Sequence, residues 1–354
     1  LGHWGFGMSW LIVSIYYYGE VDLITSILIF SLLVILLTFV FTIPLLLANT
    51  LISSLKIKSR PTKIILVSGI FLLIEFTRYF FLNGVPWLIP GNIFLDTITQ
   101  STYSVFGVSF ASLLIYLICS IIVQYNKSKI TAIALVFLFI SLIPQNSNII
   151  INNGIFVTAI QPSSNPFLKY KKDYFNAFLN VKDDQVYKKI HLVPFGEYIP
   201  FFKSLRGLIN FFNLPMSNVD HGSKNQTKIT VLNGLEVSTP ICFDMAFPRT
   251  VRLMNKSSLF MINISNDTWF GESIGPYHHL SIARIRSIEN NRWTLRATND
   301  GFSAIITNKG TIVDKLEKGD SNILEGYIDL INKSSFYNKI GYISNNKNNP
   351  ELIF

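Results

Sequence analysis

Long apolar stretches dominate the first half of the chain. No charged residue lies between Leu23 and Leu55, and because a membrane-spanning helix needs roughly 20 apolar residues, this stretch is expected to be a span. Further spans are expected around residues 64–82 and 105–123, and a shorter one at 131–143 if its flanks contribute. The segment 8–18 is too short to span and is expected to lie at the membrane surface or to be the remnant of a longer helix. The pattern predicts a multi-pass α-helical membrane domain.

From Gly154 the sequence pattern changes, and short β-rich runs and turn signals replace the apolar stretches. The pattern "KITVLNGLEVSTPICF" predicts a hairpin with its turn at Asn233-Gly234. Apolar positions at helical spacing in "PYHHLSIARIRSIENNRW" predict a helix. Strands mixed with helices favour an α/β or α+β domain. Three regions are therefore expected: a membrane domain at 1–148, a globular domain at 149–333 and a polar tail at 334–354.

Charge agrees with this division. Charged residues make up 14% of the chain, against about 25% in a typical soluble domain. The net charge is +9, but no basic run is interleaved with stacking aromatics, so no nucleic-acid partner is expected. Basic loops stay in the cytoplasm, which places Lys56–Lys63 and Lys127–Lys129 inside and the chain after Pro144 outside. Because the chain opens with Leu1, it is expected to be a fragment or an N-terminally shortened product.

The two cysteines suggest reactive chemistry at one position only. Cys119 lies in an apolar stretch, so a disulfide framework is not expected. Cys242, in "ICFDMAFP", has two interpretations. A free cysteine is usually a small buried hydrophobe. Cys242 nevertheless closes a predicted strand, where a strand-to-helix turn exposes a side chain and directs backbone N–H groups towards it.

Other candidate residues also have two interpretations each. Lys189 and Glu197, in "KKIHLVPFGEYIP", are each expected to be solvated when taken singly; with Cys242 they form a weak nucleophile, cation and acid hypothesis. Glu75 and Arg78 lie on one helix face, either as a mutually neutralising pair or as residues lining a site.

Three aromatic residues are candidates for contacting a lipid. Trp87 follows a proline on an outer loop and is either an interfacial anchor or a residue at the level where an acyl chain enters. Trp269 and Phe270, in "NDTWFG", either line a groove or pack in the core. The adjacent His278 and His279 point apart on a helix, so no metal site is expected, and nothing in the sequence indicates a cofactor.

Taken together, several motifs identify a family. The segments "YKKIHLVPFGEYIP", "ICFDMAFP", "ISNDTWFGESIGPYHH", "ARIRSIENNRW" and "RATNDGFSAII", with "EFTR" and "GVPWL" in the first half, resemble the apolipoprotein N-acyltransferases. These are integral membrane members of the nitrilase, or carbon–nitrogen hydrolase, superfamily. The resemblance implies a multi-pass bacterial inner-membrane protein whose periplasmic domain is a nitrilase-like α-β-β-α sandwich.

The resemblance also implies a ping-pong reaction. Cys242 would take a fatty acyl chain from a phospholipid as a thioester and pass it to the N-terminal amine of a diacylglyceryl-cysteine in a lipoprotein. Lys189 would stabilise the oxyanion, and Glu197 matches the second essential glutamate of the family. The candidates for substrate contact remain Trp87, Trp269 and Phe270, on the grounds of their positions in the sequence. A monomer without metal or cofactor is expected.

The chain also departs from the family pattern. The segment that carries the family's general-base glutamate in a Pro-Glu setting is replaced by a short Lys-rich connection whose acids are Asp173, Asp183 and Asp184. A deletion near residues 176–182 is therefore inferred, and Phe243-Asp244 stands where the family prefers Tyr-Glu. Two alternatives follow from these departures: a catalytically impaired remnant of the enzyme or, less in keeping with the apolar helices, a membrane-tethered amidase.

Overall fold

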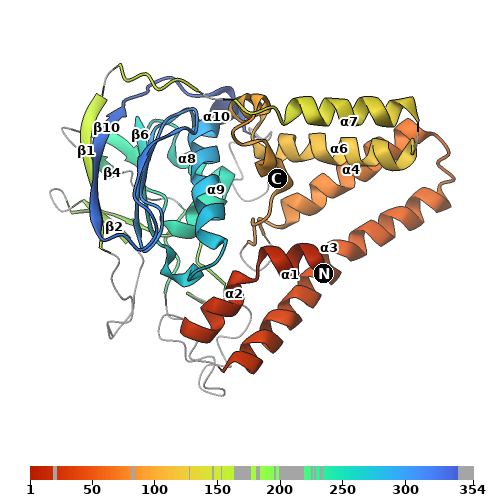
Figure 1. The fold of residues 1–354 in the computed structure, drawn as a ribbon, viewed down its shortest axis with the longest axis horizontal. Coiled ribbons are helices and arrows are strands. Elements are labelled where there is room, and N and C mark those ends of the chain that lie inside the picture. The colour runs from red at the N-terminus through yellow and green to blue at the C-terminus, as the bar shows by residue number, and fades with distance from the viewer. Residues whose placement is uncertain are drawn as a thin grey trace.

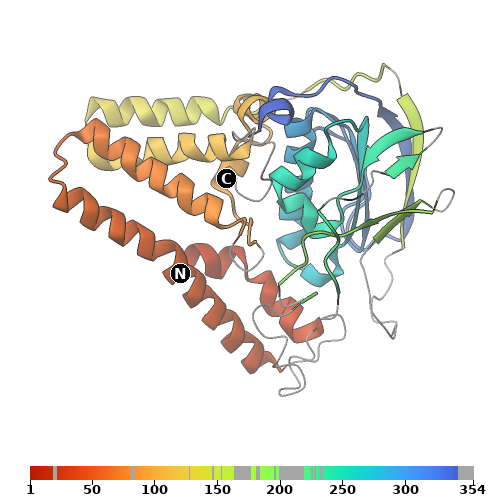
Figure 2. The same ribbon diagram turned by 180° about the vertical axis from the view of Figure 1, so that it is seen from behind.

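The computed structural model describes residues 1–18, 22–80, 84–126, 128–145, 147–152, 154–162, 177–180, 184–194, 197–198, 219–224, 226, 229–231 and 234–341. It consists of a helical part and a sheet part (Figure 1). From one end to the other, the molecule passes through a two-stranded sheet, a larger sheet, a helix layer and a group of long helices. The view from behind shows the same order (Figure 2).

The expected apolar segments of the first half are helical. Residues 1–145 form α1 (Gly2–Gly7), α2 (Trp10–Val13), a π-helical turn η1 (Ser14–Tyr18), α3 (Leu23–Ser54), α4 (Arg60–Thr77), the 3₁₀ turns η3 (Pro90–Phe94) and η4 (Ile98–Thr102), α5 (Tyr103–Phe106), α6 (Val108–Gln124) and α7 (Lys129–Ser141). Among the described residues, α3 is the one helix long and apolar enough to cross a membrane by length and composition.

Local sequence signals set several of these helices. Asp22 caps α3, because its carboxylate accepts the Thr25 N–H at 3.0 Å. Helices α4 and α6 pack together, and a hydrogen bond of 3.1 Å joins the hydroxyls of Ser68 and Ser120 between them. Gly91 lets η3 approach α6, since a Cβ at this position would lie 2.3 Å from the Val108 carbonyl oxygen.

The sheet part contains two layers of strands. The larger sheet has the order β4-β5-β6-β7-β8-β9. Its strands β5, β6 and β7 are parallel and the others antiparallel. Its strands are β4 (Ile229–Val231), β5 (Leu235–Ser238), β6 (Phe260–Asn266), β7 (Thr294–Asn299), β8 (Ala304–Ile306) and β9 (Ile312–Lys315). The predicted hairpin is confirmed as β4 and β5.

The second layer pairs β1 (Gly154–Gln161) with β10 (Asn322–Asp329) in antiparallel register, from Gly154 opposite Asp329 to Gln161 opposite Asn322. It packs on the larger sheet through a buried core that includes Ala159, Leu324 and Ile328. The hairpin of β2 (Ala177–Asn180) and β3 (Gln185–Lys188) is separate. Asn180 attaches the hairpin to β4 by donating to the Thr230 carbonyl at 2.6 Å.

The outer face of the β1–β10 layer has no helix over it among the described residues. Phe156, Ile160, Ile323 and Tyr327 are each more than half exposed there. The described residues of the nitrilase-like α/β domain thus comprise two strand layers and one helix layer. The second helix layer of the expected α-β-β-α sandwich is not among the described residues, and residues 163–176 lie outside them.

The helix layer on the other face connects the two parts of the molecule. It comprises α8 (Pro248–Met254) and α9 (Gly275–Asn290), the predicted helix, with α10 (Phe336–Ile340) beside them. The carboxylate of Glu289 on α9 accepts the Val108 N–H at the start of α6 at 2.8 Å. Within the segment expected as a polar tail, Tyr337 and Asn338 are buried, and Asn338 donates to the Asn290 side chain at 2.8 Å. Residues 342–354 lie outside the described residues.

Candidate active site

Cys242 lies at a sharp turn between a strand and a helix, as the sequence predicts. It follows β5 and begins a 3₁₀ turn, η7 (Cys242–Ala246). The preceding residue, Ile241, bridges to Ile264 on β6. Cys242 itself has φ +46°, a left-handed conformation that costs about 1–3 kcal/mol for a residue with a side chain. The thiol is therefore presented on a strained elbow at the carboxyl end of the parallel strands.

Lys189 and Glu197 form a buried ion pair, so the expectation that each is solvated is wrong. The Lys189 ammonium donates to both carboxylate oxygens of Glu197, at 2.8 and 2.7 Å. Lys189 is 1% exposed and Glu197 6% exposed. The Val193 N–H also donates to Glu197, at 2.8 Å, and this bond fixes the carboxylate. The Glu197 N–H donates to the Val193 carbonyl at 2.9 Å, and the acid meets the lysine eight residues earlier; Phe195 and Gly196 lie outside the described residues.

The electrostatics of Cys242 depend on its burial as well as on the neighbouring Lys189 charge. Burial raises the pKa of Cys242 and outweighs the lowering effect of the Lys189 charge. Glu197 and Asp267 raise it further. Burial alone would lower the pKa of Lys189, but the nearby Glu197, Cys242 and Asp244 raise it above its ordinary value. The resting site is therefore a neutral thiol beside a lysine already paired with a carboxylate.

Asp244, which departs from the Glu of the family pattern, is fully buried behind the elbow. Its carboxylate accepts the Tyr187 hydroxyl at 2.9 Å, the His191 N–H at 2.8 Å and the Ile241 N–H at 3.1 Å. Burial raises the pKa of Asp244 to about 6, against the lowering effect of Lys189 and these donors. Asp244 thus ties β3, the Lys189 segment and the elbow together.

A second hydrogen-bond network, which the sequence analysis missed, contacts the backbone of the elbow at Cys242. His279 lies with Nε2 3.1 Å from the Cys242 carbonyl oxygen and Nδ1 2.9 Å from Asp267. Arg296 donates to the other carboxylate oxygen of Asp267 at 2.6 Å. Arg296 and His279 hold the pKa of Asp267 well below its usual range despite burial. The signal available in the sequence was an acid directly after a buried strand, in "ISND", but its partners come from α9 and β7.

The predicted substrate-contacting aromatics meet in one cluster with a residue that the sequence analysis did not single out. Trp87 stacks with Phe270 at 5.8 Å and lies 6.1 Å from the His279 ring. Trp10 of α2 contacts Phe270 at 4.8 Å and Trp87 at 5.6 Å. Trp269 is adjacent, on η8 (Asp267–Phe270), and its carbonyl accepts the Ser14 hydroxyl at 2.6 Å. The N-terminal segment thus packs directly beside the elbow.

The remaining candidates are not at this site. Glu75 and Arg78 form no ion pair with each other among the described contacts; Glu75 instead accepts the Tyr116 hydroxyl at 2.9 Å. Of the acids in the shortened connection, Asp184 is an exposed turn residue, and Asp173 and Asp183 lie outside the described residues. The described residues hold no group of three or more His, Cys, Asp or Glu side chains that could bind a metal ion.

Comparisons with known proteins agree with the resemblance. The carbon-nitrogen hydrolase family model matches residues 113–333, and the model of the apolipoprotein N-acyltransferase N-terminal domain matches residues 1–121. The apolipoprotein N-acyltransferase of Pseudomonas aeruginosa (strain LESB58) is 40% identical over 159 residues, which are 45% of this chain and 31% of that protein. The Vibrio cholerae protein of the same name is 37% identical over 177 residues, 47% of this chain and 35% of that protein.

The matched region thus spans about a third of the length of these curated relatives. Among solved structures, Saccharomyces cerevisiae Nit3 of the nitrilase superfamily is similar at 20% identity over 43% of this chain and 57% of that one, with a TM-score of 0.30, too low to carry an argument. Because the carbon-nitrogen hydrolase match covers more than half of the sequence, the chain belongs to the carbon-nitrogen hydrolase family, and within it resembles the apolipoprotein N-acyltransferases.

Proposed function

We propose that the protein transfers a fatty acyl chain from a phospholipid to the N-terminal amine of a diacylglyceryl-cysteine in lipoproteins, through a thioester on Cys242. One observation carries the proposal: a cysteine on a strained elbow lies within the electrostatic reach of a buried Lys189–Glu197 pair. The matches to apolipoprotein N-acyltransferases support the choice of substrates.

In the first half-reaction, the Cys242 sulfur attacks the ester carbonyl of the phospholipid. The C–S bond forms as the ester C–O bond breaks, and the thiol proton ends on the hydroxyl of the departing lysophospholipid. The negative charge on the carbonyl oxygen is stabilised by the Lys189 ammonium and by the Phe243 N–H, which donates to no acceptor among the described residues. This arrangement places a fixed cation and a backbone donor on the same tetrahedral intermediate.

In the second half-reaction, the neutral amine of the lipoprotein attacks the thioester. The amide C–N bond forms, the C–S bond breaks, and a proton from the amine restores the thiol. Both halves need a base to relay a proton within hydrogen-bond reach of the reacting atoms. The strained backbone at Cys242 and the His279 contact to its carbonyl keep the sulfur in one position for both steps.

A second candidate function is supported by the state of the acids around the elbow. Glu197 is engaged by Lys189 and Val193, Asp267 by Arg296 and His279, and Asp244 by Tyr187 and His191. Each of these three carboxylates is already held by at least two hydrogen-bond partners, and a general base contributes about 10²- to 10⁴-fold. We therefore propose, as the alternative, a catalytically impaired relative that self-acylates slowly and transfers to the amine poorly.

We further propose that α3, α4, α6 and α7 lie in the inner membrane with the sheet domain on the periplasmic side. Two basic segments lie at the end of the helices remote from the sheets (Figures 1 and 2): residues 56–63, which comprise the connection after α3 and the first turn of α4, and Lys129, which begins α7. Such clusters favour the cytoplasm. The surface of α3 also exposes large apolar side chains such as Ile24, Leu32 and Leu47.

The proposal is tested by incubating the full chain, in detergent micelles, with a phospholipid that carries a labelled acyl chain. A label on the protein that hydroxylamine removes at neutral pH identifies a thioester. Cys242→Ser should abolish the label while leaving the folded protein intact, and Cys119→Ser serves as the matched control that should keep it. A label that survives Cys242→Ser contradicts the mechanism.

The same preparation separates the two candidates when a diacylglyceryl-cysteine peptide with a free amine is added. Rapid transfer at the rate of the Pseudomonas aeruginosa protein supports the active enzyme. A persistent thioester without amide product supports the impaired relative.

A further inference from the structure

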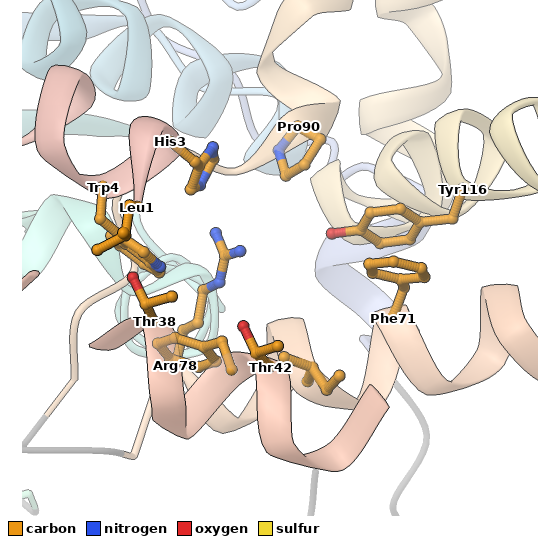
Figure 3. A pocket seen from close by; sticks show the side chains of 11 residues that line it. Leu1, His3, Trp4, Thr38, Thr42, Phe71, Arg78, Pro90 and Tyr116 are labelled. Carbon is orange, nitrogen blue, oxygen red and sulfur yellow. The ribbon is translucent and has the colours of Figure 1, made fainter. Parts of the chain in front are cut away.

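A cavity of about 330 Å³ lies between the N-terminal segment and helices α3, α4 and α6. Figure 3 shows Arg78 with its guanidinium pointing into the middle of this cavity. Arg78 directly follows α4, at the end of the helix that faces the sheet domain. The cavity is thus at the level where the proposed membrane part meets the periplasmic part.

Arg78 is a buried cation whose hydrogen bonds are incomplete. It is 8% exposed, and its Nε has no hydrogen-bond partner among the described residues. One terminal nitrogen donates to the Leu88 carbonyl at 3.1 Å and to the Trp87 carbonyl at 3.4 Å. Its other near contacts are the ring faces of Trp4 at 4.9 Å and Phe41 at 5.3 Å. The buried Glu75 lies within electrostatic reach of Arg78 but forms no ion pair with it among the described contacts. A buried guanidinium without a direct ion pair is costly, so an anion in the cavity would be stabilised.

The rest of the wall fits one end of an amphipathic molecule. His3 and the hydroxyl-bearing Thr38, Thr42 and Tyr116 surround the guanidinium, and in Figure 3 the two threonine hydroxyls point towards the same space. Apolar side chains, among them Phe71, complete the wall. A planar guanidinium with free donors matches the geometry of a phosphate group.

The cavity is also linked to the active site. Arg78 holds the backbone of Trp87, the Trp87 ring lies 6.1 Å from that of His279, and His279 contacts the Cys242 carbonyl. Three successive contacts therefore connect the guanidinium to the elbow. An occupant of the cavity would lie beside the aromatic cluster that borders Cys242.

We propose that this cavity binds the phosphate of a phospholipid headgroup, with Arg78 as its anion-binding residue. The proposal rests on the proposed function, since it locates the donor lipid before its ester is attacked. The same chemistry would accept free phosphate, and the two sources are separated below by the probes used. Arg78 is a binding residue here and does not contact the reacting atoms.

The experiment measures lipid binding without turnover. The full chain carrying Cys242→Ser is purified in a non-ionic detergent, and bound molecules are counted by native mass spectrometry during titration. The probes are dioleoylphosphatidylglycerol, dioleoylglycerol, which lacks the phosphate, and inorganic phosphate as a competitor. We expect the phospholipid to bind at least tenfold more tightly than dioleoylglycerol, and millimolar inorganic phosphate to leave it bound.

Three further substitutions, each added to Cys242→Ser, assign the site. Arg78→Gln should weaken phospholipid binding at least tenfold, which corresponds to about 1.4 kcal/mol. Thr42→Phe should do the same by filling the cavity while leaving the guanidinium in place. Arg60→Gln is the matched control, because Arg60 begins the same helix, is exposed and lies over the Tyr125 ring; it should leave binding within twofold.

Several outcomes would overturn the proposal: equal binding of dioleoylglycerol, displacement of the lipid by inorganic phosphate, or unchanged binding in Arg78→Gln. If Arg78→Gln does not fold, the lipid affinity of Thr42→Phe alone tests whether the lipid occupies the cavity. Failure of this inference is distinguishable from failure of the proposed function. If lipid binds through Arg78 but Cys242 never forms a thioester, the proposed function is contradicted and the lipid-binding inference stands. If Cys242 forms a thioester but neither cavity variant changes lipid binding, the lipid-binding inference is contradicted and the proposed function stands.

Discussion

Replacing Glu197 by glutamine tests the buried ion pair at the centre of the site. The change keeps the shape of the side chain but removes the charge that pairs with Lys189 at 2.7 Å. Both side chains are nearly inaccessible, and removing one partner of a buried pair costs about 3–5 kcal/mol. About 1 kcal/mol shifts the melting temperature by roughly 2–4 °C for a domain of 150–250 residues. A fall of roughly 6 °C or more is therefore expected.

The same substitution should make the thiol more reactive while it destabilises the fold. Glu197 is among the groups that raise the pKa of Cys242, whereas the Lys189 charge lowers it. With the carboxylate gone, one of the groups that oppose the Lys189 charge is removed, so iodoacetamide should alkylate Cys242 faster at each pH between 7 and 9. The measurement is made in chains that carry Cys119→Ser, so that Cys242 is the one thiol that reacts. Loss of stability without a gain in alkylation would mean that Glu197 acts on the fold alone.

A double-mutant cycle with Lys189→Met decides whether the two residues are coupled. Each single variant leaves a buried charge without its partner, whereas the double variant leaves none. The loss of unfolding free energy in the double variant should therefore be smaller than the sum of the two single losses, by on the order of 3 kcal/mol. The pKa of Lys189 is raised above its ordinary 10.5, so the contribution of the pair is fully present at pH 7. It is lost only as the pH rises through that raised value. Thermal unfolding monitored by tryptophan fluorescence at pH 7 gives the four values, and losses that add within about 0.5 kcal/mol would refute the coupling.

Three further substitutions probe the surroundings. Because the native pKa of Asp244 is about 6 against an ordinary 3.8, its contribution to stability is complete below pH 4 and is lost as the pH rises to 6. Asp244→Asn should therefore remove a decline of roughly 3 kcal/mol over that interval in a pH series of unfolding midpoints. Asp267→Asn breaks the buried pair with Arg296 and should cost about 3–5 kcal/mol by urea titration, while a change below 1 kcal/mol would contradict the network. Trp10→Ala should lower stability by about 3–5 kcal/mol, and an unchanged melting temperature would mean that its packing on Phe270 contributes nothing.

Much of the sheet domain could be predicted because its signals are local. The hairpin turn before β5 and the helical spacing of α9 each depend on neighbouring residues, and each element lies within a few residues of its expected place. The elbow at Cys242 followed from the same signals, since the end of a strand and the start of a turn can be read on either side of it.

The interior of the site could not be predicted, because it depends on contacts between distant segments. In the sequence, Lys189 and Glu197 each have the pattern of an ordinary solvent-exposed residue. Only the structure shows that they are buried together. His279 reaches Cys242 from a helix 37 residues later. The pKa of the thiol depends on a competition that sequence does not quantify: burial outweighs the lysine charge, and Glu197 has already neutralised much of that charge.

The pairing of β1 with β10 has a consequence for how the domain is made. Its two strands are the first and last of the sheet domain, and Gly154 lies opposite Asp329. A ribosome must therefore synthesise nearly the whole domain before β1 finds its partner, and until then β1 presents an unpaired edge. Contacts this distant in sequence close late and slow folding. We therefore expect completion of β10, rather than formation of the elbow at Cys242, to be the step that commits the newly made domain to its native state.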